Sequence, residues 1–412
     1  MARVLLVTQN FPPETSAAAN RLGAMAEALA ARHELSVVAL RPSFPSPSLY
    51  DPEGVRAHDA NLPYSLRRAF RFLPHKGSLV TRALREHAIA LLLAGAAVRE
   101  RADVVVTSSP IMFLAPAAWV LARLKSARFV WDVRDLTWLY ARDASPGGVQ
   151  AALLALLERY MWFVARRADL VAVPTTGSRD LFVDHGVRPS RVIIVANTIS
   201  HSLVEALGTA RDTVQKERPL VTYAGVIGHM HQLGALLAAA RELPDVDFVI
   251  AGDGVDRRAL EERARAEGLT NVEFAGYVKR GQLLELYGRT DILFGSMRDR
   301  PTFNRATIPT KLFEYMAVGK PVLFAGKGAA AELVREAGCG VSVPPDDPAA
   351  IGGAIRSLLD SPERRAKLGA MGRSFVARTP SRAEVMAEFA RILDERLAET
   401  GQDTRAASSG AP

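Results

Sequence analysis

Residues 308–324 read IPTKLFEYMAVGKPVLF and predict a short helix that leads into a buried strand. Pro309 ends an irregular run, and Thr310 is placed to cap a helix that runs from about 311 to 318. Gly319 breaks this helix, and the apolar run from 321 to 324 is typical of a buried strand. The segment therefore predicts a helix whose amino end opens at the edge of a sheet.

The amino end of this helix is suited to an anion. Unpaired backbone N–H groups and the positive end of the helix dipole favour a phosphate or pyrophosphate there. Lys311 lies in the first turn, where a cation is unfavourable for the helix alone but useful beside an anion. Glu314 lies one turn further on and can accept two hydrogen bonds from a vicinal diol such as a ribose. On spacing alone, an ordinary capped helix with surface charges remains the alternative.

These residues resemble the donor-site helix of family 4 retaining glycosyltransferases. The shared features are a proline, a small hydroxyl residue, a lysine, two apolar residues, Glu-Tyr, Ala, Gly and Lys-Pro-Val. The similarity extends to the bacterial branch of fucosaminyl and other amino-sugar transferases of polysaccharide assembly. It implies that Pro309, Thr310, Lys311 and Glu314 bind the donor, that Glu314 holds the ribose, and that Lys311 and Glu314 belong to the catalytic set. A second family glutamate is replaced here by Ala306.

Composition limits the class of protein. With 412 residues the chain predicts two domains, and its 49% hydrophobic and 23% charged residues are typical of soluble globular proteins. A net charge of +8 predicts acidic partners: nucleic acid, anionic lipid or phosphorylated substrates. The single cysteine, Cys339, excludes an internal disulfide. Because no apolar run reaches ~18 residues, we expect a cytoplasmic protein, attached to the membrane at most through its surface.

Alternating apolar runs and helical periodicities predict an α/β fold with two separate sheets. The resemblance implies the GT-B architecture, in which two doubly wound Rossmann-like domains face each other across a cleft. Strands are expected in the first domain at 3–8, 35–40, 103–107, 129–133, 170–173 and 192–196, and in the second at 220–223, 248–252, 272–276, 291–295, 321–324 and 340–343.

The predicted domain boundaries follow from where these patterns stop. Residues 1–200 form the expected acceptor-side domain, and the polar, weakly patterned stretch 201–219 is the expected linker. Residues 220–380 form the expected nucleotide-sugar domain. Residues 381–400 predict a helix that crosses back to the first domain, and the small polar residues 401–412 predict a disordered tail.

The loop after strand 3–8 is a candidate acceptor site, because open α/β sheets bind ligands at the carboxyl ends of their strands. It resembles the acceptor loop of the family, with Ser16 beginning a Ser-Ala-Ala run in place of Gly-Gly. Arg21 lies in the first turn of the next helix. We expect it either to meet a phosphate or to face solvent.

A second acceptor-side loop follows strand 129–133. Its sequence, Arg134-Asp135-Leu-Thr-Trp138, resembles the Arg-Asp-Leu-Trp-Pro signature of the same branch, without the proline. Asp135 is the predicted catalytic carboxylate that positions or deprotonates an acceptor hydroxyl. Trp138 or Tyr140 is expected to stack on a sugar. The alternative is that Arg134 and Asp135 form an ion pair that only fixes the loop.

Further donor contacts are expected in the second half of the chain. Gly225 and Gly228 lie in a turn between a strand and a helix, where backbone can approach a pyrophosphate. Val278 follows strand 272–276 at a position that resembles the backbone facing the nucleotide base. Many family members carry Arg or Lys just beyond the glycine turn, where this chain has other residues: His229, His231 and Gln232.

Residues 62–73 interleave apolar side chains with Arg67, Arg68 and Arg71, within an irregular stretch from 42 to 74. An amphipathic basic segment of this kind predicts contact with an anionic membrane surface or a lipid-linked acceptor. The alternative is a helix packed on the first domain with its arginines in water.

The predicted activity is retaining sugar transfer from a nucleotide-diphosphate donor to a hydroxyl acceptor, without cofactor or metal. Asp245 and Asp247 precede their strand, so they are not in position to hold a divalent ion. The chain lacks a Walker motif and any nucleic-acid-binding motif. A nucleotide-sugar epimerase and a non-catalytic nucleotide-sugar-binding relative remain alternatives.

Overall fold

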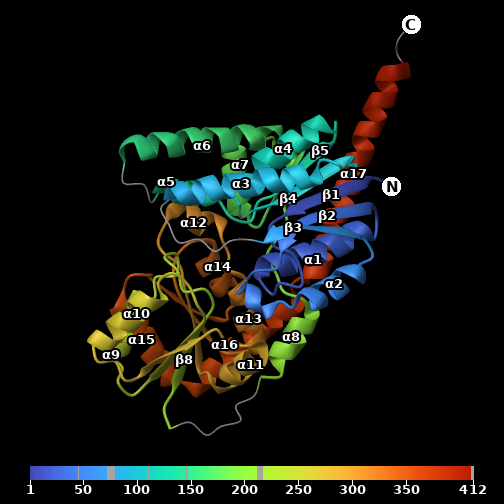
Figure 1. The fold of residues 1–412 in the computed structure, drawn as a ribbon. Coiled ribbons are helices and arrows are strands. Elements are labelled where there is room, and N and C mark those ends of the chain that lie inside the picture. Colours follow the sequence, from blue (N-terminus) through green and yellow to red (C-terminus); the bar gives the residue numbers. More distant parts are fainter. Residues whose placement is uncertain (45, 72–78, 110, 144–146, 211–216, 410–412) are drawn as a thin grey trace. The chain divides into compact units, whose positions relative to one another are not determined.

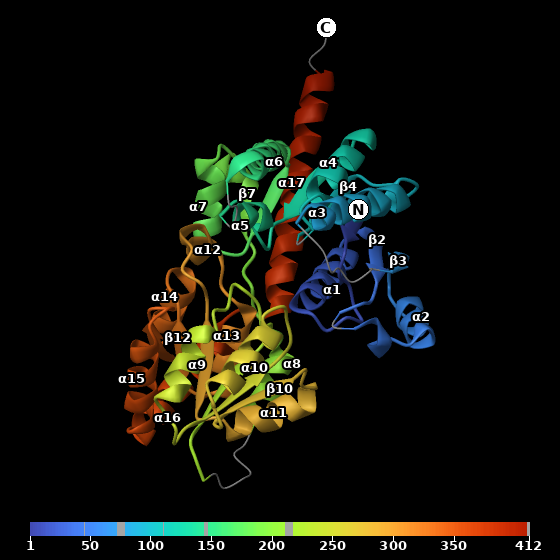
Figure 2. The ribbon, with the colours of Figure 1, turned by 60° about the vertical axis from the view of Figure 1, so that its left-hand side comes forward.

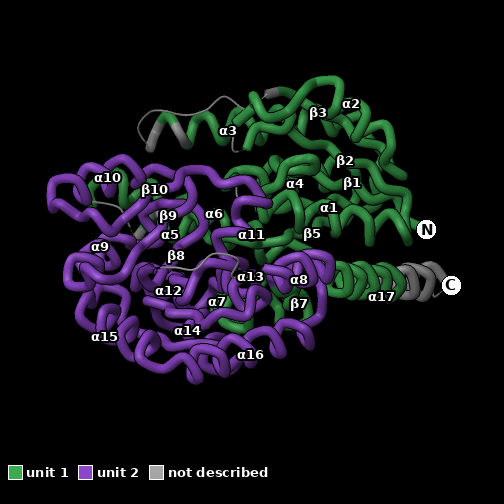
Figure 3. Tube along the Cα trace, turned by 90° about the horizontal axis from the view of Figure 1, so that it is seen from below, with its two compact units in different colours: residues 1–196, 382–412 green, residues 197–381 purple. Residues whose placement is uncertain are grey.

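The structure of the protein is a computed structural model that describes residues 1–44, 46–71, 79–109, 111–143, 147–210 and 217–409. The chain divides into two compact units, shown in different colours in Figure 3. Unit 1 contains residues 1–196 and 382–412, and unit 2 contains residues 197–381. None of the described helices is long and apolar enough to cross a bilayer.

Unit 1 is built on a seven-stranded parallel sheet with the order β3-β2-β1-β4-β5-β6-β7 (Figure 1). Most of its strands are continuous apolar runs, as expected for parallel strands covered on both faces. The strands are β1 (Arg3–Thr8), β2 (Glu34–Arg41), β3 (Ser65–Arg71), β4 (Val104–Ser108), β5 (Arg128–Asp132), β6 (Leu170–Val173) and β7 (Val192–Ile194).

Two layers of helices cover this sheet. On one face α1 packs beside the C-terminal helix α17, and Met25, Leu29, Phe389 and Leu393 join the same buried core (Figure 2). On the other face α3 packs against α4, and α4 against α6 (Figure 1). The helices of unit 1 are α1 (Ala17–Ala30), α2 (Pro52–Ala60), α3 (Leu79–Ala97), α4 (Leu114–Leu124), α5 (Thr137–Asp143), α6 (Gly148–Arg167), α7 (Thr176–Asp184) and α17 (Arg382–Ser409).

Unit 2 repeats the plan with a six-stranded parallel sheet of order β10-β9-β8-β11-β12-β13. Its strands are β8 (Leu220–Ala224), β9 (Asp247–Ala251), β10 (Val272–Gly276), β11 (Ile292–Ser296), β12 (Val322–Ala325) and β13 (Gly340–Val343). Its helices are α8 (His201–Gly208), α9 (Gly234–Arg241), α10 (Arg257–Ala266), α11 (Arg280–Arg289), α12 (Pro301–Ala306), α13 (Thr310–Val318), α14 (Ala329–Glu336), α15 (Pro348–Leu359) and α16 (Pro362–Arg378).

Both sheets are doubly wound, which confirms the predicted fold class of two parallel-sheet α/β domains. In each sheet the strand order reverses direction, between β1 and β4 in unit 1 and between β8 and β11 in unit 2. At such a switch point the loops at the carboxyl ends of the strands are free to bind a ligand. The candidate ligand-binding loops are therefore those after β1, β4 and β5 in unit 1 and those after β8 and β11 in unit 2.

The basic segment 62–73 differs from its expected irregular or helical structure, while its contact with a membrane stays a prediction. Residues 65–71 form the edge strand β3, paired parallel to β2, and Leu62, Tyr64 and Leu66 pack on the core of unit 1. Arg68 does not face outward: its side chain is 9% exposed and pairs with Asp59 at 2.8 Å. The side chain of Arg71 and residues 72–73 lie outside the described set.

Two further expectations differ from the structure. The predicted linker 201–219 begins with helix α8, whose amino end is capped by Ser200 Oγ accepting from the Leu203 N–H at 3.2 Å. In place of a disordered tail from 401, helix α17 continues to Ser409, while residues 410–412 lie outside the described set.

Candidate functional site

Lys311 is the central side chain of the candidate site in unit 2. It lies in the first turn of α13, and its Nζ donates a hydrogen bond to Tyr223 Oη at 2.7 Å. The same Nζ lies 4.1 Å from the centroid of the Tyr223 ring. Tyr223 is fully buried near the carboxyl end of β8. In the part of the chain that the structure describes, no carboxylate lies within ion-pair distance of Lys311.

The surroundings of Lys311 change its protonation. Burial lowers the pKa of its ammonium to about 7, and the carboxylate of Glu314 offsets only part of that shift. Burial also raises the pKa of Tyr223 well above its ordinary value, so its hydroxyl stays neutral. A neutral oxygen therefore takes the place that a counter-ion usually occupies beside a buried lysine. An incoming anion would favour the charged form of Lys311.

Two tyrosines fix the junction between β8 and its loop. Tyr223 Oη donates to the carbonyl of Val226 at 2.5 Å while it accepts from Lys311. Tyr315, on α13, donates to the carbonyl of Ala224 at 3.1 Å and accepts from the Ala224 N–H at 3.0 Å. Because both hydroxyls bond backbone on either side of residue 225, the turn after β8 is held against the first turns of α13.

Gly225 is required by the backbone conformation of this turn, because its φ lies in a region that residues with a side chain rarely adopt. Its φ is +146°, and a Cβ at this position would lie 2.7 Å from Lys311 Nζ. The next turn packs on it as closely, since a Cβ at Gly252 would lie 1.8 Å from the Gly225 carbonyl oxygen. Gly228 differs: it meets nothing closer than 3.8 Å, so sterics alone do not require glycine there.

His231 and Gln232 complete the edge of this site. The Nδ1 of His231 lies 3.1 Å from the carbonyl of Ser296, and burial, with Lys311 as the second cause, lowers the pKa of the imidazole to about 3. The neutral ring therefore donates from Nδ1 and keeps Nε2 as an acceptor. Gln232 has φ +39°, and its buried Oε1 has no hydrogen-bond partner among the described residues. Strain and an unpaired polar atom together are typical of a ligand site.

The segment before α13 is held by a residue that sequence reasoning did not assign to the site. The amide of Asn197 donates to the carbonyl of Ile308 at 3.4 Å. Pro309 takes the capping position, and Thr310 is the first helical residue, without a side-chain capping bond. The predicted Thr310 cap is therefore wrong, because the helix begins one residue earlier than expected.

The remaining donor-side positions surround the same edge of the sheet. Glu314 is half-buried one turn beyond Lys311. Burial is the largest cause that raises the pKa of Tyr315, and the carboxylate of Glu314 raises it further. Val278 is half-buried in the loop after β10. Ala306 is buried at the end of α12, so its position offers no carboxylate to a donor sugar.

In unit 1, Arg21 is buried, and its side chain is hydrogen-bonded within the protein. Its guanidinium is 4% exposed and holds both oxygens of Asp132, at 2.8 and 3.2 Å. It also donates to the carbonyls of Val195 and Ala196 at 2.9 and 3.2 Å. Ser108 Oγ adds a bond to Asp132 at 2.8 Å. Both expectations for Arg21 are wrong, because its donors join α1, β5 and the segment that follows β7.

In the Arg-Asp-Leu-Thr-Trp loop, the tryptophan is buried in the core, whereas the arginine and the aspartate are half-buried. Trp138 is 1% exposed and packs on Trp131 with ring centroids 5.5 Å apart, so it cannot stack on a sugar. Arg134 and Asp135 are half-buried, and the structure shows no ion pair between these two described residues. The backbone N–H of Arg134 donates to Ser109 Oγ at 2.9 Å. Burial excludes Trp138 from contact with an acceptor, whereas the acceptor-side role of Asp135 stays a prediction.

Ser16 has a structural role. Its Oγ accepts from the Ala19 N–H at 3.1 Å and caps α1. The structure therefore gathers two sets of residues, each within its own unit. Lys311, Tyr223, His231, Gly225 and Glu314 lie at the carboxyl edge of the second sheet, and the first sheet gathers Arg21, Asp132, Arg134 and Asp135. Asp132 is not among the residues predicted from the sequence. The signal that would identify it is a polar residue at the end of an apolar strand.

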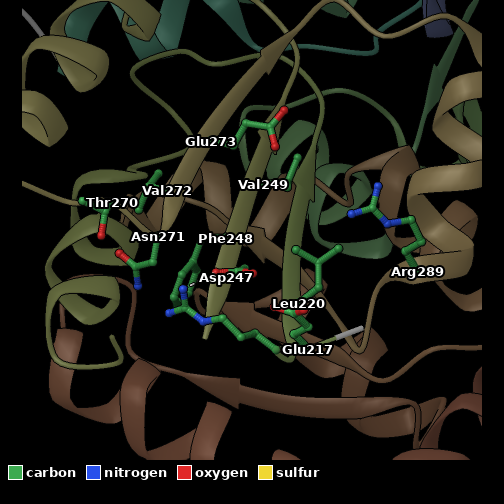
Figure 4. Close-up of a pocket in the computed structure, with 11 residues that line it drawn as sticks. Glu217, Leu220, Asp247, Phe248, Val249, Thr270, Asn271, Val272, Glu273 and Arg289 are labelled. Atoms are coloured by element: carbon green, nitrogen blue, oxygen red, sulfur yellow. Dashed lines mark ion pairs between the residues drawn. The ribbon is translucent and has the colours of Figure 1, made fainter. Parts of the chain in front are cut away.

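A hollow of about 430 Å³ lies at the opposite edge of the second sheet (Figure 4). It is lined by first residues of strands, among them Leu220, Asp247 and Val272, and by an ion pair between Arg218 and Asp247 at 3.1 Å. Since open α/β sheets bind ligands at carboxyl ends, this amino-end hollow is not the candidate site. No cluster of three or more metal-ligating side chains occurs in the described ranges.

Comparison with known proteins identifies the families of the two domains. Residues 210–375 match the family described as glycosyl transferases group 1, and residues 16–198 match the glycosyl transferase 4-like domain. WcaI of Escherichia coli K12, named for glycosyl transfer in colanic acid biosynthesis, is 25% identical over 94% of this chain and 98% of its own length. A GDP-mannose-dependent α-(1-6)-phosphatidylinositol monomannoside mannosyltransferase of Mycolicibacterium smegmatis is 24% identical over 90% and 92%. Anabaena HepE, crystallised with UDP and glucose, has a TM-score of 0.70 at 15% identity over 96% of this chain and 100% of HepE.

Proposed function

Because this chain belongs to the glycosyltransferases that pair a glycosyl transferase 4-like domain with a group 1 domain, we propose retaining transfer of a sugar from a nucleotide-diphosphate donor to a hydroxyl. Unit 2 binds the donor at the carboxyl edge of its sheet, and unit 1 binds the acceptor. Assignment to the amino-sugar branch stays a prediction.

The observation that carries the proposal is the state of Lys311. Its ammonium lies in the first turn of a helix, beside a glycine turn, with a tyrosine hydroxyl as its hydrogen-bond acceptor. Backbone N–H groups of that turn and a cation without a carboxylate at ion-pair distance together favour a diphosphate. The pKa of Lys311, lowered to about 7, is further support, because the charge becomes favourable only when an anion arrives.

The other donor-side residues bind the ribose, the base and the transferred sugar of the donor. Glu314 accepts the hydroxyls of the ribose, and the backbone at Val278 faces the base. Gly225 leaves room for the diphosphate beside Lys311. The neutral Nε2 of His231 and the amide of Gln232 are free to bond hydroxyls of the transferred sugar.

In the proposed step, the bond between the anomeric carbon and the diphosphate oxygen breaks, and its electron pair leaves with the diphosphate. The acceptor oxygen bonds the anomeric carbon on the face that the diphosphate leaves, and the acceptor proton passes to Asp135. Lys311 and the α13 N–H groups offset the charge gained by the diphosphate, which is the task that metal ions perform in other transferases. The reaction therefore needs no metal.

A panel of UDP-, GDP- and dTDP-sugars, measured by calorimetry with excess chelator, tests the proposal. One donor class should bind, and Glu314→Gln should weaken it by about 1–3 kcal/mol, the scale of a lost charge-assisted hydrogen bond. The matched control is Glu332→Gln, an exposed glutamate in the first turn of α14.

Three outcomes would contradict the proposal in different ways. If no nucleotide sugar binds, the donor site is wrong. If turnover on an acceptor extract stops in chelator and returns with magnesium, the leaving-group chemistry is wrong. If the sugar is isomerised without any acceptor, the enzyme is an epimerase of the same architecture.

A further inference from the structure

Unit 1 carries an exposed apolar surface on the helices α3, α4 and α6. On each helix the exposed apolar side chains recur at helical spacing and so form one stripe. We call these residues the apolar face: Leu84, Leu91 and Val98 from and just after α3, Val120 and Leu124 from α4, and Val149, Leu153, Leu156 and Tyr160 from α6.

The three stripes converge. A hollow of about 240 Å³ is lined jointly by Leu91 and Val98, by Val120 and Leu124, and by Tyr160. Figure 1 shows the three helices side by side on one face of the sheet, and α4 packs against both neighbours. The apolar face is therefore one surface and not three unrelated patches.

The exposure is too large for ordinary surface residues. Leu124 is 77% exposed, Leu153 62% and Leu91 57%, and nine of the eighteen large apolar side chains that are exposed in the described residues belong to the apolar face. Soluble monomers rarely expose contiguous apolar patches of more than a few hundred Å². Such a surface is typical of a site that a partner or a membrane covers.

The charges around the apolar face favour one partner. The three helices contain six arginines and two glutamates. Exposed arginines adjoin the stripes at their ends, with Arg99 beside Val98, Arg123 beside Leu124 and Arg159 beside Tyr160. Among the described residues, none of these three arginines has an ion-pair partner, so the rim of the face is positive.

The two glutamates offset only a small part of the charge of the six arginines. Glu158 is buried and bonded by Arg142 and by the indole N–H of Trp162 at 3.3 Å. Glu86 accepts the backbone N–H of Met112 at 3.3 Å. A second copy of the chain would bring the same basic rim against itself, which like-charge repulsion disfavours.

We propose that the apolar face docks on an anionic membrane surface. The leucines enter the boundary between head groups and acyl chains, and the arginines contact lipid phosphates. The proposal concerns a different surface from the edge strand β3, whose Arg68 is held inside unit 1. It rests on the surface alone and does not require the proposed sugar transfer.

Flotation with vesicles tests it directly, using the full chain and phosphatidylcholine vesicles with or without phosphatidylglycerol. The wild type should bind the anionic vesicles and be released by salt. The triple variant Leu91→Gln, Leu124→Gln, Leu153→Gln should lose binding by roughly a thousandfold, because each leucine contributes roughly tenfold. Since all three side chains are exposed, the fold should be unaffected.

A second variant separates charge from apolar contact. Arg123→Gln with Arg159→Gln should weaken binding roughly 25-fold, at about fivefold for each arginine near an anionic surface. The matched control removes two exposed arginines of unit 2, Arg265→Gln with Arg280→Gln, and should leave binding close to the wild type. Val255→Gln, 77% exposed in unit 2, is the apolar control.

Three results would overturn the proposal. The first is no binding to anionic vesicles by a folded wild type. The second is binding that the leucine variant leaves unchanged. The third is a wild-type dimer in solution that the leucine variant converts to a monomer, because the face would then be covered by a second copy. A failure of nucleotide-sugar binding would affect none of these readouts, so the two proposals fail separately.

Discussion

Each unit has a buried or partly buried cation at the carboxyl edge of its parallel sheet, but the two cations differ in the partners that the protein provides. In unit 1, Arg21 holds both oxygens of Asp132 and two backbone carbonyls. In unit 2, Lys311 holds a tyrosine hydroxyl at 2.7 Å and lies against the face of the same ring. One cation is saturated by the protein, and the other leaves donors for something else.

The difference separates a structural charge from a functional one. Desolvating an ion costs several kcal/mol unless partners replace its water. Arg21 has these partners and so joins three parts of unit 1. No described carboxylate lies at contact distance from Lys311, and burial lowers the pKa of its ammonium to about 7. Burial of a basic residue is therefore no sign of function until its partners have been counted.

The largest expected effect is on stability in unit 1. Arg21→Leu leaves Asp132 buried with Ser108 as its remaining side-chain partner, so unfolding should become easier by about 3–5 kcal/mol. The matched change in unit 2, Lys311→Met, removes a desolvated charge and should change stability by less than about 1 kcal/mol. Urea titration measures both. Equal losses in the two variants would remove the distinction between the cations.

A smaller effect is expected from the hydroxyl that positions Lys311. Tyr223→Phe keeps the ring but removes the acceptor of the ammonium, so nucleotide-sugar affinity should fall by about 1 kcal/mol. Calorimetry with the donor selected from the panel measures the change, with Tyr160→Phe on α6 of unit 1 as the control. Unchanged affinity would mean that Lys311 is placed by α13 alone.

The sheets could be predicted because parallel strands buried on both faces are nearly uninterrupted apolar runs. β3 has no such run: its sequence, SLRRAFR, mixes apolar residues with three arginines and resembles an amphipathic surface segment. The contacts that hold β3 in place come from other segments of the chain: Arg68 pairs with Asp59 and donates to the carbonyl of Leu40. An edge strand with an inward arginine is therefore hidden from local pattern.

The candidate site shows the same limit. Lys311 and Glu314 could be found because they share one helix turn and a motif. Tyr223 lies 88 positions from Lys311, and Asp132 lies 111 positions from Arg21, so neither pair leaves a local signal. For the same reason the local sequence predicts Arg21 in water or on a phosphate and Trp138 at a sugar. Their neighbours come from other parts of the chain.

Proton uptake on donor binding tests the central claim most directly. With the pKa of Lys311 at about 7 in the free protein, the amine is mostly neutral at pH 8, and an adjacent diphosphate raises the pKa. Binding should therefore take up roughly 0.9 proton at pH 8 and roughly 0.1 at pH 6, while affinity falls as pH rises through 7. A nucleotide diphosphosugar suits the measurement, because its diphosphate diester does not titrate in this range.

The measurement is calorimetry at both pH values in buffers that differ in ionisation enthalpy. The account predicts the stated uptake for the wild type and none for Lys311→Met. Binding without proton uptake at pH 8, or the same uptake in Lys311→Met, would contradict the claim that Lys311 is held ready for the diphosphate.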